Sequence, residues 1–171
     1  MQETKWAPTV VLVDADYLDT LALDLIENFG RMLNRRIPSA DLCHWVDCVL
    51  LDGGVRPGKN EVQVHFLHSK EKDTLQYFQP SRFADDINGL SFDDNLGHIS
   101  LFADEFFLQS LTMLADVKEV ERLMVVGDMR AYGQAVKDIC SQTDGKQITL
   151  FTMEPQTGQG FSQEILGYSL M

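Results

Sequence analysis

The sequence predicts an α/β fold, a three-layer α/β/α sandwich with a mainly parallel central sheet. Two apolar runs, Thr9–Val13 and Leu123–Val126, are uniformly hydrophobic and are followed by Asp14 and by Gly127-Asp128. Such runs are typical of parallel strands that helices cover on both faces. Segments with helical periodicity alternate with the strands, as in a sheet with right-handed crossovers. We therefore expect the two strands to be adjacent, parallel and near the centre of the sheet.

The first half of the chain carries two helical patterns and one alternating strand. Residues 17–36 place leucines at helical spacing and end before Pro38. Ser39 can cap a second helix with its apolar face between Leu42 and Leu50, and Gly53-Gly54 can end it. Residues 61–68 alternate apolar and polar side chains, which predicts a strand with one buried face.

The second half begins with a less regular stretch. We expect a hairpin or an irregular insertion over residues 69–97, because polar turns such as Asn88-Gly89 interrupt it. Phe106 is expected to point into the core from a helix near residues 104–114. The elements expected after the insertion are a short strand 99–102, a helix near 104–114, the strand ending at Asp128, a helix 131–140 and a strand 147–152.

Length and composition bound the organisation of the chain. With 171 residues and 44% hydrophobic content, we expect one domain over residues 1–171, with its core at about 9–152 and a tail, 153–171, that packs on the domain or on a partner. A net charge of −12 argues against a broad surface for a polyanion, so nucleic-acid contact would have to be local or metal-bridged. The sequence contains no run of 18 apolar residues, so it predicts no membrane span. Its three cysteines do not suggest a disulfide framework. We therefore expect a soluble, acidic, cytoplasmic protein with no membrane partner.

The two aspartates at the strand ends are the strongest candidates for a site. The carboxyl ends of parallel strands open onto the ligand crevice of an α/β sheet, so Asp14 and Asp128 can converge on one cation or phosphate. Arg130 is expected at the same edge, where it can contact an anion or pair with Asp128. On this reading Asp14 and Asp128 are the candidate catalytic residues.

The order of these features resembles the PIN-like nuclease superfamily, especially its NYN branch, over residues 9–152. The resemblance implies a Rossmann-like sandwich whose acids bind Mg²⁺ or Mn²⁺ and hydrolyse RNA. It assigns the metal to Asp14, to Asp104 or Glu105, and to Asp128, because clustered carboxylates hold hard divalent cations. The chain has Tyr17 where that branch usually has asparagine and Arg130 where it has a second late aspartate, which favours a degenerate site.

Two alternatives stay open beside this resemblance. Asp14-Ala15-Asp16 and Gly127-Asp128 resemble the first and last motifs of haloacid-dehalogenase-like phosphatases, although Leu18 and Tyr132 replace residues expected there. In the other alternative the acids are only helix caps: Asp14 or Asp16, Asp104 and Asp128 each precede a helical segment. The chain would then be a non-catalytic scaffold for protein association, with homodimerisation the simplest case.

Overall fold

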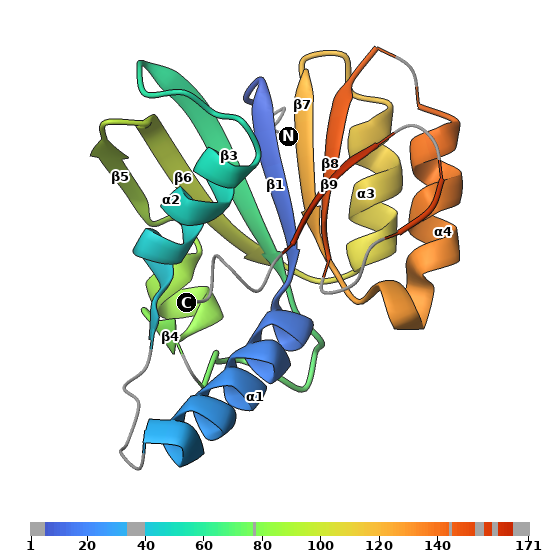
Figure 1. Ribbon diagram of the computed structural model, residues 1–171. Coiled ribbons are helices and arrows are strands. Elements are labelled where there is room, and N and C mark those ends of the chain that lie inside the picture. Colours follow the sequence, from blue (N-terminus) through green and yellow to red (C-terminus); the bar gives the residue numbers. More distant parts are fainter. Residues whose placement is uncertain are drawn as a thin grey trace.

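The computed structural model describes residues 6–33, 40–76, 78–143, 145–152, 156–158 and 161–165, and it has an α/β fold (Figure 1). Its larger helices and strands alternate along the chain, as the hydrophobic periodicity predicts. The elements are β1 (Thr9–Asp14), α1 (Ala15–Leu33), β2 (Ala40–Asp41), α2 (Leu42–Asp52), β3 (Asn60–Leu67), β4 (Phe78–Gln79), the π-helix η1 (Phe83–Ile87), β5 (Ser91–Asp94), β6 (Gly97–Asp104), α3 (Phe107–Ala115), β7 (Arg122–Val126), α4 (Met129–Ser141), β8 (Gln147–Thr152) and β9 (Ser162–Ile165).

Among the described residues, seven strands form one sheet in the order β5-β6-β3-β1-β7-β8-β9. All neighbouring pairs are parallel except β5 with β6, which form an antiparallel hairpin. The prediction that the first strand and the Asp128 strand are adjacent, parallel and central is confirmed, since β1 pairs with β7 from Thr9–Arg122 to Val13–Val126. Residues 10–13 and 123–126 are at most 1% exposed, which explains why both strands are apolar on both faces.

Helices pack on both faces of this sheet. One face carries Val11, Val13, Met124 and Val126 and packs against α2 and the start of α1. The opposite face carries Val10, Leu12, Leu123 and Val125 and packs against α3 and α4, which lie over the β7 and β8 side in Figure 1. On β3 and β6, this second face presents polar and aromatic side chains: the ring of His65 stacks between Trp6 and Phe102, with centroid separations of 5.3 and 4.8 Å.

Both helices of the first half start at aspartates. α1 begins at Ala15, two residues before the predicted start, because Asp14 Oδ1 accepts the backbone N–H of Tyr17 at 3.2 Å. Of its predicted range, residues 34–36 lie outside the described residues. Ser39, the predicted cap of the second helix, also lies outside them. The observed cap is Asp41, whose Oδ1 accepts the N–H groups of Cys43 and His44.

The prediction that Phe106 points into the core is wrong. Phe106 precedes α3, its φ is 66°, and it is 64% exposed. Asp104 also does not cap this helix. It ends β6, which runs from Gly97 and is longer than the predicted strand 99–102, and its Oδ1 accepts the N–H of its neighbour Glu105 at 2.8 Å. Phe106, at the cap position of α3, makes no side-chain hydrogen bond to the helix.

A hairpin overlaps the end of the stretch 69–97, because β5 pairs antiparallel with β6 from Gly97 to Ser100. The stretch also contains η1, from which Phe83 and Ile87 are buried in the core, so the insertion contributes to the fold. Part of the tail joins the sheet as well, because β9 pairs in parallel with β8. None of the helices in the described part of the chain is both long and apolar enough to cross a membrane.

Candidate functional site

The strand order reverses direction between β1 and β7, and this is where the first candidate site lies. Among the described strands, the parallel ones lie in the order β6-β3-β1-β7-β8-β9. The chain therefore adds strands on one side of β1 first, as β3 and β6, and then on its other side, as β7, β8 and β9. Open α/β sheets bind ligands in the crevice at the carboxyl ends of such a strand pair. A cavity of about 600 Å³ opens there and is lined by Asp14, Asp16, Asp24, Asp128 and Arg130, among others.

Asp14 enters this cavity from the end of β1 with both carboxylate oxygens engaged. Oδ1 accepts the N–H of Tyr17, and Oδ2 accepts the hydroxyl of Tyr132 at 2.5 Å. Burial raises the pKa of Asp14, and the nearby charges of Asp16 and Asp128 add to this rise, while the two hydrogen bonds oppose it. Its carboxylate is therefore stabilised mainly by Tyr132 and by the first turn of α1.

Tyr132 holds the two strand ends together. Its hydroxyl donates to Asp14 and accepts the backbone N–H of Asp128 at 2.9 Å. Burial, followed by the negative charge of Asp14, raises the pKa of Tyr132, so the phenol stays protonated and remains a donor. The phenol thus connects Asp14 on β1 to the backbone that follows β7.

The chain around Tyr132 is built to place this ring. Its φ of −140° and ψ of 24° depart from helical values inside α4. Its ring packs against Phe107, with centroids 5.2 Å apart. Gly127 leaves the necessary space, since a Cβ there would lie 2.8 Å from the Tyr132 hydroxyl and 3.1 Å from Phe107 Cζ. These three features fix the hydroxyl above the end of β7.

Asp128 acts as the N-cap of α4. Its Oδ1 accepts the N–H groups of Arg130 at 3.1 Å and Ala131 at 3.3 Å. The helix-cap alternative therefore describes Asp128, and it also describes Asp14 through Tyr17. Asp16 instead ties α1 to the turn after β3, because its Oδ2 accepts the N–H of Ser69 at 3.0 Å.

The other two predicted metal ligands lie farther along the same edge. Asp104 and Asp14 are both register partners of Leu67, so one strand separates them and their Cα atoms are about 10 Å apart at ordinary strand spacing. Neither Asp104 nor Glu105 lines the cavity that contains Asp14 and Asp128. Within the described part of the chain, no three His, Cys, Asp or Glu side chains are grouped closely enough to hold a metal ion.

Of the predicted metal ligands, Asp14 and Asp128 therefore share one cavity, and Asp104 and Glu105 lie outside it. The structure brings together Asp14, Asp128 and Arg130, as the sequence predicts, and adds Tyr132. Sequence reasoning considered Tyr132 only as a departure from a phosphatase motif. The available signal was Gly127, since a glycine directly before a helix cap indicates that another group approaches the backbone closely.

Comparison with known proteins gives a family but no named activity. Neither the curated proteins nor the solved structures contain a match to this chain. A family model does match, over residues 3–171, and it covers nearly the whole sequence. The chain belongs to this family, described as a family of unknown function (DUF6621).

Proposed function

We propose that the chain is a non-catalytic interaction domain of PIN/NYN-like, Rossmann-like architecture, in which the acids at the carboxyl edge support the fold instead of a metal. The observation that carries this proposal is the Tyr132 hydroxyl, which hydrogen-bonds to Asp14 and to the Asp128 backbone. A metal ion or a substrate at Asp14 would compete with this contact for the same carboxylate. A hydrogen bond to a charged group contributes about 1.5–3 kcal/mol, so a ligand that displaced it would have to offset that loss.

The positive charge of Arg130 supports the same conclusion. Arg130 lines the cavity in place of the second late aspartate of the NYN branch. A cation at this position repels a divalent metal.

The interaction surface we propose centres on Phe106. This aromatic side chain is 64% exposed at the carboxyl edge, and it is the one described residue other than glycine with a positive φ. Left-handed backbone costs a side-chain-bearing residue about 1–2 kcal/mol, and such strain is retained mainly where it serves a function. Exposed aromatic residues are enriched where proteins bind one another, and the simplest partner is a second copy of the chain.

The test compares metal-dependent activity with self-association. Purified wild type is incubated with single-stranded RNA and millimolar Mg²⁺ or Mn²⁺, and its melting temperature is measured with and without metal. We expect no cleavage and no shift beyond that of an Asp14→Asn, Asp128→Asn double variant. Sedimentation velocity over a range of concentrations should show reversible association that Phe106→Gly weakens and Met113→Gln, a change at another exposed apolar side chain, does not.

RNA cleavage by wild type that is lost in Asp14→Asn would overturn the proposal and support the alternative, a divalent-metal-dependent ribonuclease. The observation in favour of that alternative is the cavity itself, which places Asp14 and Asp128 where α/β sheets bind ligands. Glu71→Gln is the matched control, because it removes an exposed acid in the turn after β3, outside the cavity and outside the predicted metal ligands.

A further inference from the structure

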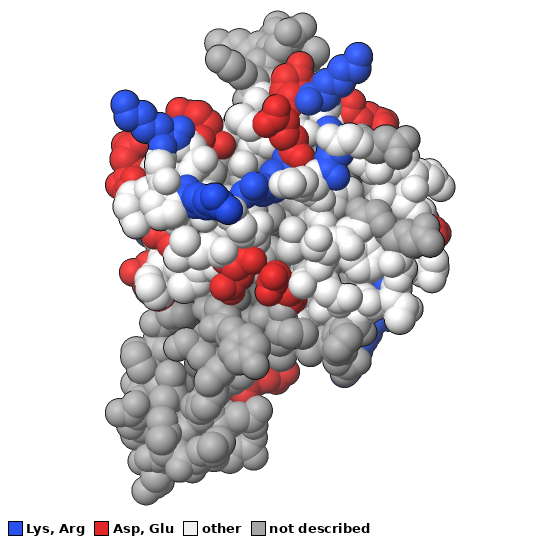
Figure 2. Space-filling view, turned by 45° about the horizontal axis from the view of Figure 1, so that its top comes forward, with Lys and Arg blue, Asp and Glu red and all other residues white. Residues whose placement is uncertain are grey.

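A larger groove lies at the opposite edge of the sheet, where the parallel strands begin. It encloses about 1120 Å³ and is lined by the first residues of four strands, Thr9, Asn60, Arg122 and Gln147, and by the loop after α2. Figure 2 shows Lys and Arg side chains gathered on the face that contains this edge, with acidic side chains beside them. The groove is separate from the cavity at Asp14, which lies at the other ends of the same strands.

The charge of this groove is opposite to that of the whole chain. Among the described residues, four cationic side chains line it, Arg56, Lys59, Arg122 and Lys146, against the two acids Glu61 and Glu121. The chain as a whole carries −12. A local excess of positive charge on an acidic protein attracts a compact anion, whereas a long polyanion would meet the repulsion of the remaining surface.

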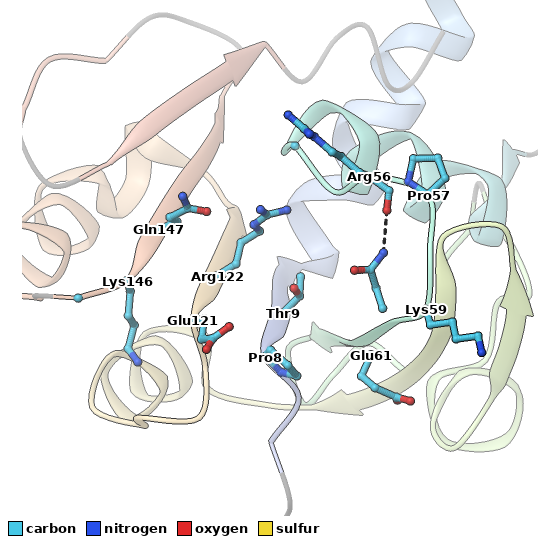
Figure 3. A pocket seen from close by; sticks show the side chains of 13 residues that line it. Pro8, Thr9, Arg56, Pro57, Lys59, Glu61, Glu121, Arg122, Lys146 and Gln147 are labelled. Atoms are coloured by element: carbon cyan, nitrogen blue, oxygen red, sulfur yellow. Dashed lines mark hydrogen bonds between the residues drawn. The ribbon is translucent and has the colours of Figure 1, made fainter.

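Two of the four cations are available to a ligand within the groove. Lys146 is already engaged, because its Nζ donates to the backbone carbonyls of Val117 and Val120. In the close view of Figure 3, Lys59 points away from the centre, whereas Arg56 and Arg122 extend toward the same side from the loop and from β7. Among the described residues, neither arginine forms an ion pair.

The backbone that carries these two arginines is held in place. The Asn60 side-chain amide donates to the Arg56 carbonyl, the bond drawn as a dashed line in Figure 3, and to the Leu96 carbonyl, both at 2.8 Å. These two bonds fix the loop after α2. The N–H of Arg122 donates to the Pro8 carbonyl at 2.9 Å and ties the start of β7 to the segment before β1. Because the backbone at both arginines is already fixed, it loses less conformational entropy when a ligand binds.

We propose that this groove binds a compact ligand that carries a phosphate or diphosphate group, held by Arg56 and Arg122. The planar guanidinium group presents paired donors that match the oxygens of a phosphate, and charge-assisted pairs of this kind are the strong ones. A second cavity of about 640 Å³ shares Gly54, Arg122, Lys146 and Gln147 with the groove, and it provides space for the organic part of such a ligand.

Isothermal titration of the full chain with inorganic pyrophosphate tests this proposal. We expect saturable binding that weakens by about tenfold or more in the Arg56→Gln, Arg122→Gln double variant, as loss of a charge-assisted pair predicts. The matched control is Lys70→Gln, Lys72→Gln, which removes the same charge from exposed residues in the turn after β3, at the other edge of the sheet. Titration with ADP then distinguishes the two sources of the diphosphate group. Tighter binding of ADP than of pyrophosphate indicates a nucleotide, and binding of ADP that is no tighter indicates a free inorganic anion.

Glu121→Gln provides a test with the opposite sign. This change removes a carboxylate from the groove wall and should tighten pyrophosphate binding, and it remains informative if the double arginine variant fails to fold. Absence of saturable binding by wild type would overturn the proposal. Equal weakening in the lysine control would also overturn it, since binding would then follow net charge and not the groove.

Discussion

Replacing Tyr132 with phenylalanine removes one oxygen atom and two hydrogen bonds. The Asp14 carboxylate loses the hydroxyl that donates to it at 2.5 Å, and the Asp128 N–H loses its acceptor at 2.9 Å. Loss of a hydrogen bond to a charged group costs about 1.5–3 kcal/mol, and an unsatisfied buried N–H adds about 1 kcal/mol or more. We expect Tyr132→Phe to lower the free energy of unfolding by about 3 kcal/mol, which corresponds to a fall in melting temperature of roughly 6–12 °C for a domain of this size.

The measurement is urea denaturation followed by circular dichroism, at neutral pH and at low pH. The Tyr132 hydrogen bond lowers the pKa of Asp14, so its removal raises that pKa further above the ordinary value. A carboxyl group with a raised folded-state pKa contributes stability at low pH that is lost as pH rises through that pKa. The destabilisation by Tyr132→Phe should therefore be larger at neutral pH than at low pH, where Asp14 is protonated.

A double-mutant cycle with Asp14→Asn isolates the contact. The cost of Tyr132→Phe should fall when Asp14 is already asparagine, because the charge that the hydroxyl stabilises is then absent. A loss of stability below about 0.5 kcal/mol, within the range of ordinary surface substitutions, would refute the reasoning. Identical losses at both pH values would refute the electrostatic part of it.

Three further predictions concern the core, the backbone and the pH dependence. Val126→Asp places an unpaired charge at a fully buried position of β7, at a cost of several kcal/mol, and should abolish the cooperative thermal transition; a normal transition would contradict the observed burial. Phe106→Gly should be more stable than Phe106→Ala by about 1 kcal/mol in urea denaturation, because only glycine adopts a φ of 66° without strain; equal stability would show that the backbone relaxes. Burial and the neighbouring carboxyl of Asp94 raise the pKa of Asp47 from 3.8 to about 7, so stability from this group is lost as pH rises through that range. Asp47→Asn should therefore melt above wild type at about pH 8, with a smaller difference at about pH 5, whereas a constant difference would exclude this titration.

Local patterns in the sequence determined the central strands and the cap of α4. Residues 10–13 and 123–126 are apolar at every position because both faces of these strands are covered, and this requirement is visible without knowing what covers them. Asp128 was recognisable as a cap because the cap hydrogen bonds join residues only two and three positions apart. The predicted strand over residues 147–152 matches β8 for the same reason, since its apolar run is local.

Only the tertiary structure decided which side chains meet. The Tyr132–Asp14 contact joins residues 118 positions apart, and it depends on the order of β1 and β7 and on the space left at Gly127. Phe106 fits the helical spacing of its neighbours, yet the left-handed turn before α3 carries it out of the core. The groove at the amino edge gathers Arg56 and Arg122 from segments that share no sequence motif. Periodicity reports how much each residue is buried, whereas a contact between two distant side chains depends on where both lie in the folded sheet, which helical or strand spacing does not give.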